Sequence, residues 1–317
     1  MPTEQSPVLT GAQNIIGQIR QVVVGKDQVL LWVLAAILAK GHILLEDIPG
    51  VGKTTMALAY SKSLGLSYNR VQFTPDVLPS DVTGYNMLNP NDGSMQYQPG
   101  GVLCNLFLAD ELNRATSRTQ SALLEAMEEG QVTVDGVTHK LPQPFLVIAT
   151  QNPIGAAGTQ LLPDSQLDRF MVRLQMGYPE KNDEIAMVEQ RQNRQPMAEI
   201  LAVTDGDEIL QLRDIVEKTF ISKDVIRYVV ELIAVTRTDP LLRQGASPRA
   251  TLAVVAMSKA VAQLRGRDYV TPKDVQEVFL PTVAHRLILS AEALGKELTA
   301  EEILTKILKS VPAPRLG

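Results

Sequence analysis

The chain has 317 residues, 45% of them hydrophobic, which is long enough for about two domains with a sizeable core. Its formal net charge of −5 and pI near 5.4 give no global electrostatic reason to expect nucleic acid, which is a weak candidate as a partner. The longest apolar run, residues 29 to 39, is too short to span a bilayer. Because the N-terminus also lacks the cationic and apolar regions of a secretion signal, we expect a cytoplasmic protein without membrane insertion.

Cysteine and histidine do not indicate a metal site. Cys104 is the only cysteine, which excludes an internal disulfide, and its apolar surroundings predict a buried small hydrophobic residue. His42, His139 and His285 are scattered without the spacing of metal ligands. A metal site built from these residues therefore has no support in the sequence.

Short apolar runs alternate with helical patterns through the first half of the chain. The candidate strands are residues 42 to 46, 67 to 72, 103 to 109, 145 to 150 and 171 to 174. The segments with helical apolar spacing are residues 28 to 40, 53 to 65 and 117 to 129. Strands that alternate with helices predict a parallel sheet covered on both faces, so we expect an α/β core.

Two segments interrupt this alternation. Residues 132 to 140 place Asp135-Gly136 between two β-prone runs, which predicts a hairpin with a two-residue type I′ turn. Residues 73 to 101 are rich in Pro, Asn, Asp and Gly, and this segment is longer than a passive connection usually is. We therefore interpret the second segment as a functional or contact loop.

Strand patterns largely stop after Tyr178-Pro179. The helices predicted beyond this point are residues 180 to 192, 207 to 219, 222 to 238, 248 to 265 and 271 to 287. Thr271-Pro272 supplies an N-cap and a first helical residue, and Thr299 with Glu302 forms a capping box that starts a short final helix. The expected organisation is an α/β core over residues 1–178 and an all-helical domain over residues 179–317.

The stretch HILLEDIPGVGKTTMALAY, which begins at His42, has the composition of a phosphate-binding loop between a strand and a helix. Gly50 and Gly52 would let backbone N–H groups converge on an anion at the positive end of the helix. Lys53 would reach the β and γ phosphates, and the Thr54 hydroxyl would hold Mg²⁺.

The first position of the strict pattern is Gly, and in this chain it is Asp47. We expect Asp47 to adopt the left-handed backbone conformation there, because Asp tolerates it better than most residues. Its carboxylate must point away from the phosphates, since an anion turned inward would oppose their binding.

Two carboxylates follow the apolar strand in NLFLADELNRA. Asp110 and Glu111 come at its carboxyl end, where ligands bind in open α/β sheets. Asp110 would assist Mg²⁺ coordination, directly or through water, and Glu111 would polarise the attacking water. Asn152 ends the apolar run FLVIATQN and would orient that water, although Asn-Pro is also a common turn.

Two arginines complete the candidate site. Arg169 in LPDSQLDRF lies just before a strand, and Arg249 in QGASPRATLAVVA lies in the first turn of a helix. Their position alone is also compatible with two surface arginines. Their assignment as functional residues therefore depends on the motifs around them.

Five motifs in order resemble the MoxR family of AAA+ ATPases over almost the whole chain: EDIPGVGKT, LFLADELNRATSRTQSALLEAMEEGQVTVDG, IATQNPIGAAGT, LPDSQLDRF and GASPRA. The resemblance implies an AAA+ P-loop core with a parallel sheet, followed by a helical lid domain. It also implies that residues 73 to 101 are a helix-2 insert and that residues 132 to 140 are the hairpin before sensor 1.

The same resemblance implies a role for each candidate residue. Walker A spans residues 47 to 54, and Walker B ends at Asp110-Glu111. Sensor 1 is Asn152, the arginine finger is Arg169 and sensor 2 is Arg249, acting in its own site or in a neighbour's. The implied ATP-binding residues are Val23, Val24, Gly25, Pro49, Gly50, Val51, Gly52, Lys53, Thr54 and Thr55, with Thr54 and Asp110 as ligands of Mg²⁺.

The resemblance finally implies ATP hydrolysis that drives chaperone-like remodelling or maturation of partner proteins, a hexameric ring, and a partner with a von Willebrand factor A domain. A ring is physically reasonable, because an arginine beyond the sensor strand completes a phosphoryl-transfer site only by reaching a neighbour. Two alternatives stay open. One is a chelatase-type motor subunit for metal insertion, and the other is a non-hydrolysing nucleotide-dependent scaffold, which would not need Glu111.

Overall fold

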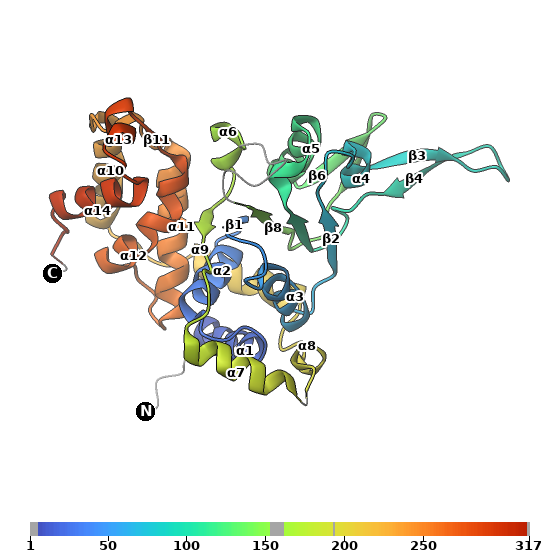
Figure 1. The fold of residues 1–317 in the computed structure, drawn as a ribbon, viewed down its shortest axis with the longest axis horizontal. Helices are drawn as coiled ribbons and strands as arrows, with labels where there is room; N and C mark the ends of the chain where they lie inside the picture. The colour runs from blue at the N-terminus through green and yellow to red at the C-terminus, as the bar shows by residue number, and fades with distance from the viewer. Residues whose placement is uncertain (1–5, 153–161, 193, 316–317) are drawn as a thin grey trace.

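The structure is a computed structural model that describes residues 6 to 152, 162 to 192 and 194 to 315 (Figure 1). Within these ranges, five parallel strands form one sheet in the order β2-β5-β8-β1-β9. The strands are β1 (Ile43–Glu46), β2 (Tyr68–Gln72), β5 (Leu106–Asp110), β8 (Leu146–Gln151) and β9 (Val172–Leu174). The predicted α/β core is confirmed. The largest difference is at β5, where residues 103 to 105 form a bend before the strand.

Helices cover both faces of the sheet, because successive strand residues point to opposite sides. Ile43 and Leu45 face the cluster formed with α2 (Asp27–Leu38) and α3 (Lys53–Ser63). Leu44 faces the cluster formed with α5 (Ser117–Glu129), which also contains buried Cys104. The three inner strands β5, β8 and β1 are therefore nearly continuous apolar runs, whereas the edge strand β2 carries polar residues.

The N-terminal helix α1 (Pro7–Arg20) is an element that the sequence interpretation missed. It buries Val8, Ala12, Ile15 and Ile19, which form one apolar stripe at helical spacing, and it packs against α3. Pro7 occupies the first helical position, where its missing N–H costs nothing. Both signals were present in the sequence.

The insert at residues 73 to 101 is more ordered than the predicted loop. It contains the short helix α4 (Pro79–Thr83) and an antiparallel hairpin of β3 (Gly84–Leu88) and β4 (Met95–Pro99). Figure 1 shows this hairpin extending away from the sheet. The loop expectation was wrong for these residues, since paired strands satisfy the backbone groups that a polar loop would leave to water.

The hairpin predicted at residues 132 to 140 is confirmed. It consists of β6 (Gln131–Val134) and β7 (Val137–Lys140), with positive φ at Asp135 and Gly136 as a type I′ turn requires. The two hairpins touch at two places. Asn86 Nδ2 donates to Asp135 Oδ2 at 2.8 Å, and the rings of Tyr97 and His139 stack with centroids 3.7 Å apart.

The C-terminal part of the chain is mainly helical. Its elements are α7 (Lys181–Gln192), α8 (Pro196–Glu199), α9 (Gly206–Glu217), α10 (Lys223–Thr238), β10 (Leu242–Gln244), α11 (Pro248–Leu264), α12 (Pro272–Val283), β11 (Ile288–Leu289), α13 (Ala291–Gly295) and α14 (Ala300–Ser310). The N-cap predicted at Thr271 and the capping box predicted at Thr299 both form, and Thr271 additionally makes a capping box with Asp274. Among the described residues, no helix combines the length and hydrophobicity that a membrane span requires.

The expectation of an all-helical C-terminal part needs one correction. The helix predicted to reach residue 287 ends at Val283, and β11 then pairs with β10. Pro281 lies in the last turn of α12, where a residue without N–H cannot continue the helical hydrogen bonds. The chain after Val283 forms a turn of 3₁₀ helix, and β11 then pairs with β10 in a short antiparallel ladder.

The lid helices pack against the helices that lead into β1. α9 and α11 contact α2, and the buried side chain of Arg213 on α9 donates from Nε to the carbonyl of Ile37 at 2.9 Å. Burial lowers the pKa of Arg213 to about 10. This packing places the first turn of α11 beside the amino ends of the strands rather than beside their carboxyl ends.

Candidate nucleotide-binding site

The segment between β1 and α3 forms an open cradle at the carboxyl ends of the strands. Gly50 and Gly52 have φ of 86° and 96°, a region that favours glycine. A Cβ added at Gly50 would meet no atom within 4 Å, and one at Gly52 would meet only Met176 Cε at 3.8 Å. The cradle therefore opens toward space at the N-terminus of α3, where backbone N–H groups bind anions well.

Lys53 lies in this cradle and is only 7% exposed. Its Nζ donates to the carbonyl of Asp47 and, at 3.2 Å, to that of Ile48. Burial lowers the pKa of Lys53, while the carboxylates of Asp47, Asp110 and Glu111 oppose the shift. A bound phosphate would supply the charged partner that these neutral carbonyls do not.

The oxygen atoms beside the cradle fit a magnesium ion. Thr54 Oγ1 and Asp110 Oδ2 lie 3.4 Å apart. Mg²⁺ prefers oxygen ligands at about 2.1 Å in octahedral geometry, so two neighbouring ligands lie about 3 Å from each other. The structure thus brings together the two residues predicted to hold the metal.

Glu111 and Asn152 also meet at this edge of the sheet. Asn152 Nδ2 donates to Glu111 Oε1 at 3.2 Å, and Arg114 Nη1 donates to Glu111 Oε2 at 2.8 Å. Glu111 has φ of 57°, a left-handed conformation that costs a non-glycine residue on the order of 1–3 kcal/mol. Sequence reasoning missed Arg114, although its i,i+3 spacing from Glu111 was a usable signal.

Thr150 connects the two Walker B carboxyl residues. Its hydroxyl donates to Asp110 Oδ1 at 2.6 Å and accepts from the backbone N–H of Glu111 at 2.8 Å. Residues 153 to 159 of the motif IATQNPIGAAGT lie outside the described residues.

Asp47 has a different role from the expected one. Its φ is not positive, so the predicted left-handed conformation was wrong. Its carboxylate does point away from the cradle, as expected: Oδ2 accepts the N–H groups of Met176 and Gly177, each at 2.6 Å, and Oδ1 accepts that of Ile48 at 2.8 Å. Asp47 therefore ties the phosphate loop to the chain leaving β9.

Replacing Asp47 with Ala should destabilise the protein, because it leaves the N–H groups of Met176 and Gly177 without their acceptor. The expected loss of unfolding free energy is about 1–3 kcal/mol, measured by denaturant unfolding. Affinity for ATP should change by less than about tenfold, since the carboxylate does not face the cradle. A hundredfold gain in affinity would instead show that Asp47 repels phosphate.

A cavity of about 310 Å³ adjoins the cradle and has the size of a small ligand pocket. The predicted residues that line it are Val23, Val24, Gly50, Val51, Gly52 and Thr55. The residues that sequence reasoning missed are Val22, Lys26, Met176, Tyr178, Pro179, Glu184, Met187 and Arg191. The last three belong to α7, so this helix forms one wall of the cavity. Its apolar walls suit a purine ring.

Four of the predicted ATP-binding residues do not line this cavity: Lys53 and Thr54 belong to the cradle that it adjoins, and the other two are Pro49 and Gly25. Pro49 is exposed beside it. Gly25, with φ of 71°, lies under α7, where an added Cβ would come within 1.9 Å of Asp183 Oδ2. Gly25 therefore lets α7 approach closely, a role in shaping the cavity rather than in contacting a ligand.

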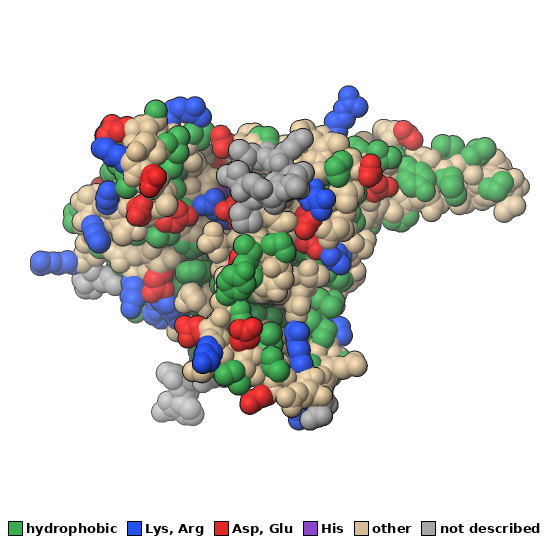
Figure 2. Space-filling model, in the orientation of Figure 1, with side chains coloured by type: hydrophobic (Ala, Val, Ile, Leu, Met, Phe, Trp, Pro, Cys, Tyr) green, Lys and Arg blue, Asp and Glu red, His purple; other side chains and the backbone are tan. Residues whose placement is uncertain are grey.

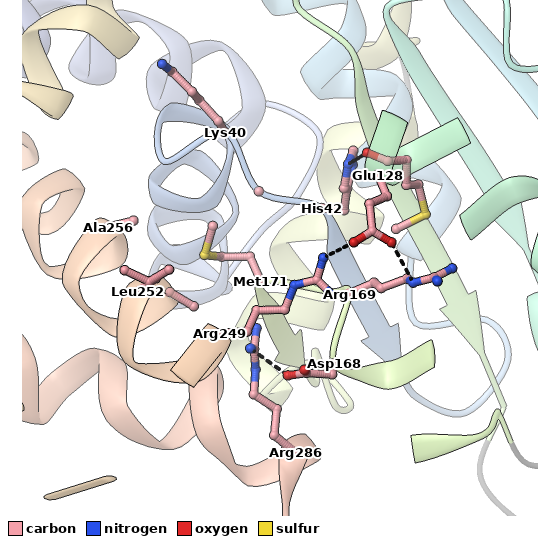
Figure 3. Close-up of a pocket in the computed structure, with 13 residues that line it drawn as sticks. Lys40, His42, Glu128, Asp168, Arg169, Met171, Arg249, Leu252, Ala256 and Arg286 are labelled. Carbon is pink, nitrogen blue, oxygen red and sulfur yellow. Dashed lines mark hydrogen bonds and ion pairs between the residues drawn. The ribbon is translucent and has the colours of Figure 1, made fainter. Parts of the chain in front are cut away.

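The two candidate arginines lie at the opposite edge of the sheet. Both bind the carboxylate of Glu128: Arg169 Nε lies 3.2 Å from Oε2, and Arg249 Nη2 lies 2.7 Å from Oε1 (Figure 3). They border a cavity of about 320 Å³ together with His42 and Met171, which precede β1 and β9. In parallel strands these are the amino ends, whereas the cradle lies at the carboxyl ends. The strand β1, which runs from one end to the other, is about 13 Å long at about 3.3 Å per residue.

Hydrogen bonds of Arg286 and His42 shape this arginine cavity. Buried Arg286 donates to Asp168 Oδ1 at 2.9 Å and to the carbonyl of Phe170 at 2.7 Å, which fixes the turn that carries Arg169. His42 bonds the carbonyl of Met127 at 3.1 Å, next to Glu128. Burial lowers the pKa of His42 to about 4 and keeps its ring neutral. Sequence reasoning assigned no role to Arg286 or Glu128.

Comparison with known proteins agrees with this arrangement. The model of the ATPase family associated with various cellular activities (AAA) matches residues 42–172, and an AAA lid domain matches residues 234–307. The chain is 37% identical to Chaperone MoxR1 of Mycobacterium tuberculosis over 96% of this chain and 83% of that protein. This chain belongs to the MoxR family of AAA+ ATPases. Membership confirms the predicted family, the P-loop core and the lid.

The chain is also similar to two further proteins and to one solved structure. The chain is 44% identical to the uncharacterized protein YeaC of Bacillus subtilis, over 94% of this chain and 93% of that one. A crystal structure from Cytophaga hutchinsonii, named provisionally as an ATPase, superimposes with a TM-score of 0.89 at 35% identity and covers 97% of this chain and 96% of that one. A magnesium-chelatase subunit ChlI of Chlorella vulgaris is more distant, at 28% identity over 71% of this chain and 61% of that protein. The comparisons thus favour the hypothesis of a MoxR-type ATPase over that of a chelatase motor subunit.

Proposed function

We propose that this MoxR-type chain hydrolyses ATP in the cytoplasm and uses the energy to remodel or mature partner proteins. Lys53 binds the β and γ phosphates, and Thr54 and Asp110 hold Mg²⁺, which when bound neutralises charge on the transferred phosphoryl group. Glu111 takes a proton from the attacking water, and Asn152 orients that water. A non-hydrolysing scaffold would have no need of a glutamate with a strained backbone whose carboxylate is held by two donors, Asn152 and Arg114.

One observation carries the proposal that the active form is a ring. The phosphate cradle lies at one edge of the sheet, and Arg169 and Arg249 lie at the other. Within one chain these arginines lie away from the phosphate cradle. The site is therefore complete only when a second copy presents the amino ends of its strands, where its own Arg169 and Arg249 lie. A repeated head-to-tail contact forms a ring when its rotation closes on the first subunit, and the ring is the arrangement that we propose. Six subunits, and a partner with a von Willebrand factor A domain, are the arrangement that the family resemblance implies.

ATP turnover per chain should therefore rise with protein concentration, by at least about tenfold across the range in which sedimentation shows monomers becoming oligomers. The reason is that an isolated chain lacks the cations that stabilise phosphoryl transfer. Lys53→Ala, which removes the phosphate-binding ammonium, is the control and should be inactive at every concentration. A rate per chain that does not change through assembly would contradict a shared site.

The two hairpins are the surfaces that we propose for contact with partners. Figure 2 shows hydrophobic side chains along the protruding β3–β4 hairpin, where Tyr85, Met87, Leu88 and Met95 are each about half exposed or more. The hydrogen bond and the ring stack between this hairpin and the β6–β7 hairpin support the idea that the two hairpins move together. A change at the γ-phosphate would reach them through the strands that carry Asp110 and Asn152.

A further inference from the structure

Arg70 is a basic residue at the nucleotide site to which the proposed reaction gives no role. It lies on β2, the edge strand next to β5. Its guanidinium donates twice to one oxygen of Asp110: Nη2 lies 2.7 Å and Nε 3.1 Å from Oδ2. Nη2 also donates to Gln72 Oε1 at 2.8 Å.

The oxygen that Arg70 binds is the one that a metal would need. Asp110 Oδ1 is directed to the hydroxyl of Thr150. Oδ2 faces Thr54 Oγ1, 3.4 Å away, and this pair forms the candidate magnesium site. With Thr54 and two donors of Arg70 around Oδ2, a metal ion has no free approach to that oxygen. The guanidinium and Mg²⁺ therefore compete for the same position.

Burial explains why Asp110 is paired with a cation from its own chain, the guanidinium of Arg70. Its side chain is only 10% exposed, and a buried carboxylate without a partner is costly. Arg70 is 44% exposed, so it can turn toward solvent when another cation arrives, whereas Asp110 cannot. Exchange of one cation for another keeps the buried carboxylate paired, so it avoids the cost of an unpaired buried charge.

We propose that Arg70 is the counter-ion of Asp110 in the nucleotide-free chain and that binding of ATP with Mg²⁺ displaces it. Arg70 thereby sets how strongly ATP binding depends on Mg²⁺. The inference rests on the proposed nucleotide site. It gives Arg70 a positioning role that acts through Asp110, and two opposite effects follow from its removal. Binding with Mg²⁺ becomes tighter because the competitor is gone. Binding without Mg²⁺ becomes weaker because Asp110 then faces the phosphates uncompensated.

The test uses the full chain with Glu111→Gln, which slows hydrolysis, and a fluorescent ATP analogue. The dissociation constant is measured once with Mg²⁺ and once with EDTA, and the ratio of the EDTA value to the Mg²⁺ value is compared. Arg70→Gln should raise this ratio by about tenfold, equal to about 1.4 kcal/mol. Arg70→Lys keeps the positive charge but cannot donate twice to one oxygen. Its ratio should lie between those of the parent and of Arg70→Gln. Arg118→Gln, at an exposed position in the first turn of α5, should leave the ratio unchanged.

A second readout is the melting temperature of the nucleotide-free protein without Mg²⁺. It should fall in Arg70→Gln, and added Mg²⁺ and ATP should remove the difference from the parent. A ratio that is unchanged or lower in Arg70→Gln would overturn the inference, because a residue that only holds Asp110 in place for the metal would lower the ratio when lost. If the parent chain does not bind the analogue at all, the proposed nucleotide site fails and this inference fails with it.

Discussion

Replacing Glu111 with Gln is expected to reduce ATP turnover by about a thousandfold while leaving ATP affinity within a few fold of the parent. The substitution keeps the shape of the side chain and an oxygen for Asn152, which donates to Oε1 at 3.2 Å. It removes the negative charge that accepts a proton from water. Loss of the ion pair with Arg114 at 2.8 Å also releases that arginine. Turnover is measured as phosphate release, and affinity as equilibrium binding.

Glu125→Gln is the matched control for this change. Glu125 is an exposed glutamate on α5, and its loss removes the same charge without touching the cradle. Its turnover should stay within about twofold of the parent. If Glu111→Gln also hydrolysed ATP at a near-normal rate, Glu111 would not be the base. The non-hydrolysing scaffold would remain open only if the parent chain itself showed no turnover.

Local sequence patterns were sufficient for the cradle and the sheet. Gly50 and Gly52 predict a phosphate-binding loop, which the structure forms with positive φ at both glycines, and the apolar runs predict buried parallel strands. The residues at the carboxyl ends of these strands meet because parallel strands end at one edge. Asp110 and Asn152 were therefore predictable without knowledge of the tertiary structure.

Contacts between distant segments were not predictable in this way. Asp47 accepts the N–H groups of Met176 and Gly177, about 130 residues away, and no local pattern identifies such an acceptor. The local rule predicted a left-handed residue instead, because it considered only the turn. Likewise, Glu128 and Arg249 are 121 positions apart. Their contact depends on how α9 and α11 pack against α2, which a periodicity argument cannot supply.

Arg169→Ala is expected to lower ATP turnover by about a thousandfold and to leave nucleotide binding nearly unchanged, as for other arginine fingers. Arg249→Ala should act in the same direction, since both guanidinium groups share Glu128. Neither arginine reaches the cradle of its own chain, so neither should contribute to ATP affinity in dilute monomer. A large loss of ATP affinity in the monomer of either variant would place that arginine in its own site.

Mixing two inactive variants tests directly whether Arg169 acts on a neighbour. Arg169→Ala subunits keep an intact cradle, and Lys53→Ala subunits keep an intact arginine edge, where Arg169 lies 3.2 Å from Glu128. In a one-to-one random ring, half the sites have an intact cradle and half of their neighbours supply the arginine. About one quarter of the parent activity should then return if the interfaces act independently. The control replaces Lys53→Ala by the double variant Lys53→Ala/Arg169→Ala, which should restore nothing. Absence of rescue in rings shown to contain both chains would mean that Arg169 does not complete a neighbour's site, and the same mixture made with Arg249→Ala decides the second arginine separately.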